Sequence, residues 1–172
     1  MIRDPRDVVV SGYFYHLWTD EKWCHIPRPR LDGKTYQEHL LSLAQDDGIA
    51  AEIGWAARNS IHHMASWDYG RTGFLELRYE EVLEDELAWF ERIFRHYGFT
   101  DRAVQRSVDI AHSFSFERVT KRKLGEVKQG THLRSGRPGE WRSVFTPAHV
   151  ALFKKLTGPT LVRLGYEADE NW

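Results

Sequence analysis

The chain has 172 residues, of which 41% are hydrophobic and 13% aromatic, so it can bury one core or most of a larger one. Lys and Arg number 24 against 25 Asp and Glu, a balance that excludes a general attraction to nucleic acid or an anionic membrane and requires any anion site to be local. The only cysteine, Cys24, excludes an internal disulfide and a thiolate metal cluster and fits a reducing compartment.

The first predicted element is a helix over residues 5–18. Asp4 followed by Pro5 is a typical helix start, because the carboxylate can accept from free amides and proline fits the first turn. Val8–Val10 favour a strand by propensity, but the spacing of Val10, Tyr13, Phe14 and Leu17 favours an amphipathic helix. The charged first residues do not form an apolar secretion signal and no later stretch is long enough to span a membrane, which predicts a cytoplasmic protein.

Residues 19–34 contain prolines and glycine and are predicted to form a long loop. Residues 74–79 alternate as a strand does. Residues 113–139 form a basic, glycine-containing segment without a clear helical pattern. Apolar spacing and turn residues predict further helices at about 36–45, 49–67, 84–97, 101–111, 147–156 and 159–164.

Two segments contain candidate anion sites. In Arg3–Ser11 a guanidinium precedes a predicted helix N-terminus and a hydroxyl lies further along it, a combination that suits a phosphate. In Arg134–Arg142 two glycines let the backbone approach a ligand and three arginines supply counter-charge. Taken alone, the first segment is better explained as a capped helix with surface arginines, and a solvated basic turn explains the second equally well.

Taken together, these segments and the predicted strand ending at Tyr79 resemble the cytosolic sulfotransferase family in order and approximate spacing. Arg3–Ser11 resembles the family's Arg-x-Pro-(Arg/Lys)-Asp-x-x-x-Ser motif, and Arg134–Arg142 resembles its Arg-Lys-Gly-x-x-Gly-(Asp/Glu)-Trp-(Arg/Lys) signature. The resemblance reaches from Arg3 to about Tyr166. It implies an α/β, P-loop NTPase-like sulfotransferase fold in one domain over residues 1–172, here as an N-terminally truncated, mostly helical portion with few parallel strands.

The resemblance also implies a donor, 3′-phosphoadenosine 5′-phosphosulfate, and no metal ion. Ser135 stands where the family usually has lysine, so one positive charge is missing. Tyr79 is expected to approach the adenine and Phe116 to pack on it, although a plain core position explains Phe116 equally well. The residues implied to contact the 3′-phosphate are Arg3, Ser11, Arg134, Ser135 and Gly136.

The family's phosphosulfate loop, with its lysine, and its general base precede the 3′-phosphate motif, which here begins at the third residue. Gly33-Lys34-Thr35 does not replace that loop, because the spacing and the flanking prolines are wrong. His25 lies in the predicted acceptor loop, whereas neighbouring His62 and His63 are expected to divide between surface and core, and no base is assigned. The chain is therefore expected to be a C-terminal portion that is inactive alone.

The function implied is transfer of a sulfuryl group to a hydroxyl or amine of a small-molecule or glycan acceptor. The loop after residue 18 is expected to frame the acceptor, with Trp18, Trp23, His25 and Tyr36 as candidate lining residues. The alternative is a non-catalytic sulfotransferase-like remnant that acts as an interaction module. A homo-oligomer is a further expectation, because a truncated sheet exposes an edge and an apolar face.

Overall fold

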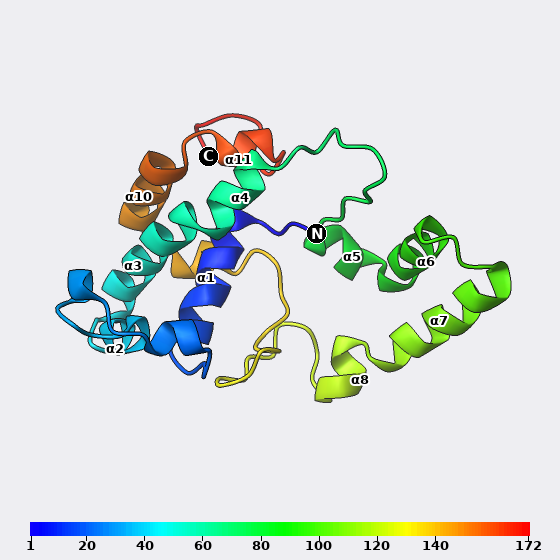
Figure 1. Cartoon of the computed structure of the whole chain (residues 1–172), viewed down its shortest axis with the longest axis horizontal. Helices are drawn as coiled ribbons and strands as arrows, with labels where there is room; N and C mark the ends of the chain where they lie inside the picture. The colour runs from blue at the N-terminus through cyan, green and yellow to red at the C-terminus, as the bar shows by residue number, and fades with distance from the viewer. The chain divides into compact units, whose positions relative to one another are not determined.

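The computed structural model describes all 172 residues, and its regular secondary structure is helical, with long irregular segments over residues 67–78 and 121–140 (Figure 1). The contacts divide the chain into two compact units. Unit 1 comprises Met1–Arg3, Asp68–Lys128 and Leu133–Arg137. Unit 2 comprises Asp4–Trp67, Gln129–His132 and Pro138–Trp172. No helix combines the length and apolar character needed to cross a membrane.

Unit 2 is built around the central helix α3, which packs against α1 and α10 (Figure 1). Its α-helices are α1 (Pro5–His16), α2 (Tyr36–Leu41), α3 (Gln45–Arg58), α4 (Ser60–Ser66), α9 (Trp141–Val144), α10 (Pro147–Thr157) and α11 (Thr160–Arg163). Two short 3-10 helices, η1 (Lys22–His25) and η2 (Pro29–Leu31), lie in the loop after α1. The predicted loop over residues 19–34 therefore contains two short helical turns.

Side-chain caps explain where the helices of unit 2 begin. Asp4 Oδ1 accepts a hydrogen bond from Arg6 N at 2.9 Å, as the Asp-Pro pair predicts for α1. At the start of α2, Thr35 and Glu38 form a reciprocal capping box. Most of the core is apolar and consists of side chains such as Val9, Tyr13, Leu40, Ile49, Ile53, Ile61, Phe153 and Leu161.

Helices α1 and α3 approach closely at Gly48. A Cβ atom built on Gly48 would lie 2.5 Å from Tyr13 Cε2, a separation that real side chains do not tolerate. The tyrosine ring therefore occupies the space that any larger residue would need. Gly48 fixes how near the two helices come, and with them the residues on their facing sides.

Unit 1 contains α5 (Tyr79–Glu84), α6 (Glu86–His96), α7 (Asp101–Ser113) and α8 (Phe116–Thr120). Helix α6 packs against α5 and α7. Asp85 Oδ1 caps α6 by accepting from Ala88 N at 3.0 Å. On its apolar side the Phe90 and Phe94 rings stack with centroids 6.1 Å apart. The apolar spacing that predicted a helix at about residues 84–97 is thus confirmed by α6.

The predicted strand over residues 74–79 is wrong as a strand. The structure has a single parallel bridge between Ile2 and Arg78, outside any named strand. One bridge pairs too few backbone groups to make a ladder, so the alternating pattern of residues 74–79 is not matched by a sheet. The family's α/β fold is consistent with this mostly helical chain but is not visible in it.

The single helix predicted over residues 49–67 corresponds to two helices, α3 and α4, in the structure. It divides at Asn59, whose φ of −117° and ψ of −97° leave the helical region. His62 and His63 are both exposed in α4, so the expected division between surface and core is wrong. Apolar spacing continues across such a break, which explains why the sequence pattern did not detect it.

Candidate functional site

The parallel bridge of unit 1 brings the first residues of the chain next to Tyr79. Ile2 N donates to Leu77 O at 2.8 Å, and Tyr79 N donates to Ile2 O at the same distance. As a result, the Arg3 guanidinium carbon lies 4.8 Å from the centroid of the Tyr79 ring. Two residues predicted from distant parts of the sequence are thus neighbours in the structure, in a cation–π arrangement.

Arg3 contains a buried nitrogen without a hydrogen-bond partner. Its Nε atom is inaccessible to solvent and donates to no protein acceptor. Buried polar atoms in folded proteins almost always have a partner, and a charged donor without one is especially unfavourable. An anionic oxygen beside Arg3 would satisfy this donor.

Tyr79 connects Arg3 to the glycine of the second motif. The Tyr79 hydroxyl donates to Gly136 O at 3.0 Å. Gly136 has a φ of +67°, and a Cβ atom built there would lie 2.8 Å from Leu124 Cδ2 and 3.2 Å from Phe116 Cε2. Both the backbone conformation and the close contact require glycine at this position. The contact also places the Phe116 ring, at the start of α8, against the backbone of Gly136.

The residues before Gly136 are held by backbone hydrogen bonds. Lys128 N donates to Arg134 O at 3.0 Å, and Gly125 N donates to Ser135 O at 2.8 Å. The Arg122 guanidinium donates to the carbonyl oxygens of Arg134, at 2.8 Å, and of Leu133. Ser135 is only 5% exposed. These bonds use backbone atoms, so they fix the turn without involving the Arg134 guanidinium.

Six of the seven predicted donor-site residues belong to unit 1, namely Arg3, Tyr79, Phe116, Arg134, Ser135 and Gly136. Arg3, Tyr79, Gly136 and Phe116 form a continuous series of contacts, and Arg134 and Ser135 precede Gly136 directly in the chain. The seventh, Ser11, belongs to unit 2 and is exposed on α1. Its assignment to the same site remains a prediction.

Two other residues of the first motif, Arg6 and Asp7, make contacts that stabilise unit 2. Asp7 accepts from Gly139 N at 2.6 Å and from Trp141 N at 3.0 Å, so its carboxylate holds the start of α9. Arg6 is 1% exposed, pairs with Asp4 and lies 3.8 Å from the centroid of the Trp141 ring. Motif analysis did not assign these roles, although the helical spacing of Arg6 with Val9 and Tyr13 indicates a buried position.

A polar network that the motifs did not reveal lies in the core of unit 2. Glu52 is 2% exposed and accepts from the Tyr36 hydroxyl at 2.8 Å. His16 Nδ1 lies 2.9 Å from the same carboxylate oxygen. Burial raises the pKa of Tyr36, and the negative charge of Glu52 raises it further. Nothing in the sequence distinguishes Glu52 from the surface carboxylates, so only packing identifies it.

Of the four residues expected to line the acceptor site, two share an aromatic cluster. Trp23 stacks on Trp55 with centroids 5.0 Å apart and planes 5° apart, and Tyr36 stacks on Trp55 at 4.7 Å. His25 and Trp18 lie elsewhere. The His25 ring contacts Thr19 O at 3.0 Å, and Trp18 packs edge-on against Tyr15.

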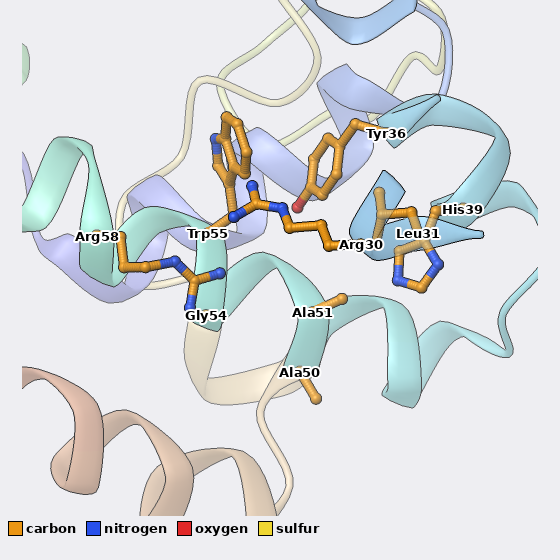
Figure 2. A pocket seen from close by; sticks show the side chains of 9 residues that line it. All are labelled: Arg30, Leu31, Tyr36, His39, Ala50, Ala51, Gly54, Trp55 and Arg58. Carbon is orange, nitrogen blue, oxygen red and sulfur yellow. The ribbon is translucent and has the colours of Figure 1, made fainter. Parts of the chain in front are cut away.

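A pocket of about 240 Å³ lies beside this cluster, between α3 and the segment that leads into α2 (Figure 2). The rings of Trp55 and Tyr36 line it on one side. Ala50, Ala51 and Gly54 line it along α3. The acceptor prediction anticipated only Tyr36 among these residues.

Comparison with known proteins identifies the family. The model of the sulfotransferase domain family matches residues 1–165. This chain belongs to the sulfotransferase domain family. It is 29% identical to human sulfotransferase 2A1 over 167 residues, which cover 91% of this chain and 53% of the relative. It is 28% identical over 167 residues to the 3-beta-hydroxysteroid sulfotransferase of Cavia porcellus, with 90% of this chain and 52% of the relative covered.

The sulfotransferase chain described here therefore spans about half the length of the curated relatives that it matches. No solved structure matches it significantly. The family match covers all seven predicted donor-site residues and both structural units. The resemblance seen in the two arginine-containing motifs is thus confirmed at the level of the family.

Proposed function

We propose that this chain contributes the 3′-phosphate and adenine half of a donor site in a sulfotransferase that uses 3′-phosphoadenosine 5′-phosphosulfate. The observation that supports this proposal best is the buried, unpartnered Nε of Arg3 beside Tyr79. A phosphate oxygen is an acceptor of the charge and geometry that a guanidinium prefers. The family membership indicates which phosphate-bearing ligand to test first.

Each proposed contact has a distinct chemical part. Arg3 and Arg134 supply positive charge to the 3′-phosphate dianion, and the hydroxyls of Ser11 and Ser135 donate to its oxygens. Gly136, whose φ of +67° is more favourable for glycine than for most other residues, lets the backbone pass close to the ligand. The aromatic rings of Tyr79 and Phe116 offer surfaces on which a flat adenine can pack.

The reaction proposed for the full enzyme is transfer of a sulfuryl group to a hydroxyl or amine. The acceptor oxygen or nitrogen forms a bond to sulfur as the bond from sulfur to the 5′-phosphate oxygen breaks. The acceptor proton leaves to a base or to solvent, and 3′-phosphoadenosine 5′-phosphate is released. The chain's own part in this scheme is to hold the nucleotide, because no residue in it is assigned as the base. A small-molecule or glycan acceptor and action in the cytoplasm complete the proposal.

Binding of 3′-phosphoadenosine 5′-phosphate, measured by titration calorimetry, tests the site. Removing one charge-assisted contact weakens binding by roughly 1.5–3 kcal/mol, so Arg3→Ala and Arg134→Ala are each expected to raise the Kd about tenfold or more. Arg102→Ala, which removes an exposed arginine of α7 in the same unit, is the matched control and leaves the Kd unchanged.

Adenosine 5′-phosphate, which lacks the 3′-phosphate, distinguishes a specific contact with that phosphate from a nonspecific attraction between the arginines and any anion. Its weaker binding is expected to be insensitive to Arg3→Ala and Arg134→Ala, because the groups that these arginines hold are absent from it. Equal affinity of the wild type and Arg134→Ala for the 3′-phosphorylated nucleotide would contradict the proposed site. Equal sensitivity of both nucleotides would assign the arginines to the 5′-phosphate instead.

A further inference from the structure

The pocket of unit 2 has an aromatic wall whose rings are fixed by contacts with one another. Trp55 stacks on Trp23, 5.0 Å away, and on Tyr36, 4.7 Å away, and the Trp23 and Tyr36 rings lie 5.9 Å from each other, so the three rings form one cluster. The Tyr36 hydroxyl is fixed by its hydrogen bond to buried Glu52 at 2.8 Å. A flat ligand that packs on this wall therefore orders few additional side chains when it binds.

The residues that line the pocket include two arginines and no carboxylate. The arginines are Arg30 and Arg58, and the lining also contains His39. Figure 2 shows the Arg30 guanidinium beside Trp55 and the Arg58 guanidinium beside Gly54. Arg28, outside the lining, adds a further positive charge 4.7 Å from the centroid of the Trp55 ring. The arginines of the lining thus offer positive charge to an anion, while the buried Glu52 carboxylate lies at the Tyr36 hydroxyl.

The two arginines at the pocket have no competing anion in the protein. Neither Arg30 nor Arg58 forms a hydrogen bond or an ion pair through its guanidinium, whereas Arg6 and Arg95 are each paired with two carboxylates. The Arg30 guanidinium carbon lies 5.9 Å from the centroid of the Trp55 ring, at the edge of the aromatic wall. A ligand that covers the ring can therefore contact this charge as well.

The lining along α3 is made of small residues. A Cβ atom built on Gly54 meets only Arg58 Nη2, at 3.9 Å, so the space above it is open. The volume of about 240 Å³ is below that of typical drug-sized sites and suits a ligand of one or two rings. Small size, flatness and negative charge together define the class of ligand.

We propose that this pocket binds a small planar aromatic anion, such as an aryl carboxylate or aryl sulfate, between the Trp55–Tyr36 wall and the guanidinium groups of Arg30 and Arg58. The proposal involves residues of unit 2 only and does not rest on the donor site proposed for unit 1. It assigns a role to Arg30 and Leu31, two residues of the predicted acceptor loop that line the pocket with α3.

The test is binding of 2-naphthoate to the whole chain, followed by tryptophan fluorescence and confirmed by calorimetry. We expect saturable binding with one site. The double variant Arg30→Ala/Arg58→Ala is expected to raise the Kd roughly tenfold, because two exposed charges are removed. Arg163→Ala, which removes an exposed arginine of α11 in the same unit, is the matched control and leaves the Kd unchanged.

Shape is tested separately from charge. Gly54→Leu fills the open space over α3 while replacing glycine with a better helix former, so it is expected to abolish 2-naphthoate binding without unfolding the chain. Gly54→Ala, which fills less of the space, keeps most of the binding. Thermal melts of all four variants verify that each one is folded before its Kd is interpreted.

Two further ligands separate the contributions of ring and charge. Naphthalene-2-carboxamide keeps the rings without the charge, and cyclohexanecarboxylate keeps the charge without the flat ring. Each is expected to bind roughly tenfold or more weakly than 2-naphthoate. Saturating 3′-phosphoadenosine 5′-phosphate is expected not to displace the probe.

The proposal is overturned by absence of 2-naphthoate binding to the wild type or by equal affinity of the wild type and the double arginine variant. Displacement by the nucleotide would also overturn it, because the probe would then occupy the donor site. Loss of nucleotide binding in Arg134→Ala with intact naphthoate binding would concern the donor site alone. The two proposals can therefore fail separately.

Discussion

Tyr36 shows how a single residue links the core of unit 2 to its pocket. Its hydroxyl donates to buried Glu52, and its ring stacks on Trp55 in the pocket wall. Burial raises its pKa above the ordinary value, and so does the nearby carboxylate. Loss of its proton would leave two negative charges together in the core, which the folded state cannot accommodate.

This raised pKa predicts a loss of stability at alkaline pH. The unfolded chain ionises Tyr36 near the ordinary pKa of about 10 while the folded chain keeps it neutral, so the stabilisation is fully present below pH 10 and is lost as the pH rises further. Between about pH 8.5 and 10.5 the free energy of unfolding is expected to fall by about 0.8 kcal/mol more in the wild type than in Tyr36→Phe. Urea unfolding at several pH values measures this difference.

Tyr97→Phe is the control, because Tyr97 is 73% exposed. It is expected to leave the pH dependence of the wild type unchanged. Parallel pH profiles for the wild type and Tyr36→Phe would show that Tyr36 ionises in the folded chain, contrary to its buried position.

At the scale of elements, the contact between α1 and α3 decides the arrangement of the unit 2 core. Gly48 faces the Tyr13 ring, whereas Gly54, less than two turns further along the same helix, faces open space. The two glycines therefore occupy one helix in opposite environments. Helix propensity favours alanine at both positions by about 1 kcal/mol, and only packing separates them.

Opposite changes in stability are expected from the same substitution at these two sites. Gly48→Ala forces a Cβ to within 2.5 Å of Tyr13 Cε2 and is expected to lower the free energy of unfolding by about 1–3 kcal/mol. Gly54→Ala is expected to raise it by up to about 1 kcal/mol. Chemical denaturation of the two variants measures both values, and a stabilising Gly48→Ala would disprove the close approach of α1 and α3.

At the scale of the whole molecule, burial is distributed unevenly between the two units. Helix α3 of unit 2 buries Gly48, Ile49, Glu52, Ile53 and Ala56, whereas α6 of unit 1 has no buried residue. Large apolar side chains of unit 1 are exposed, including Phe99, Ile110 and Phe114. Because local opening costs least where few apolar contacts are lost, the two units are expected to differ in local stability. The prediction of a single domain over residues 1–172 stays a prediction.

Hydrogen exchange measures this difference directly. Amides of α6 are expected to exchange faster than those of α3, since opening α6 exposes little additional apolar surface. Mass spectrometry of peptides from both helices compares them in one experiment, and peptides from α10 serve as a second reference in unit 2. Equal protection of α3 and α6 would show that the two units open together.

Local sequence patterns were sufficient to locate most of the helices and to identify the family of the chain. Asp4 and Pro5 at the start of α1, and the apolar spacing of α6 and α7, act through bonds within one or two turns, so they can be read locally. The arginine- and glycine-containing motifs identified the sulfotransferase family because they are short, contiguous patterns, and the family match confirms that assignment.

Packing between distant parts of the chain determines which of these residues contact one another. A backbone bridge brings Arg3 to Tyr79, and Gly136 lies close to Phe116, although these residues are far apart in the chain. The burial of Glu52 likewise depends on helices that are distant in sequence. The same physics replaced the predicted strand at residues 74–79 with a single bridge, because a strand persists only with a partner along its length. Local patterns specify local bonds, whereas long-range contacts depend on how whole elements pack, which no short stretch of sequence encodes.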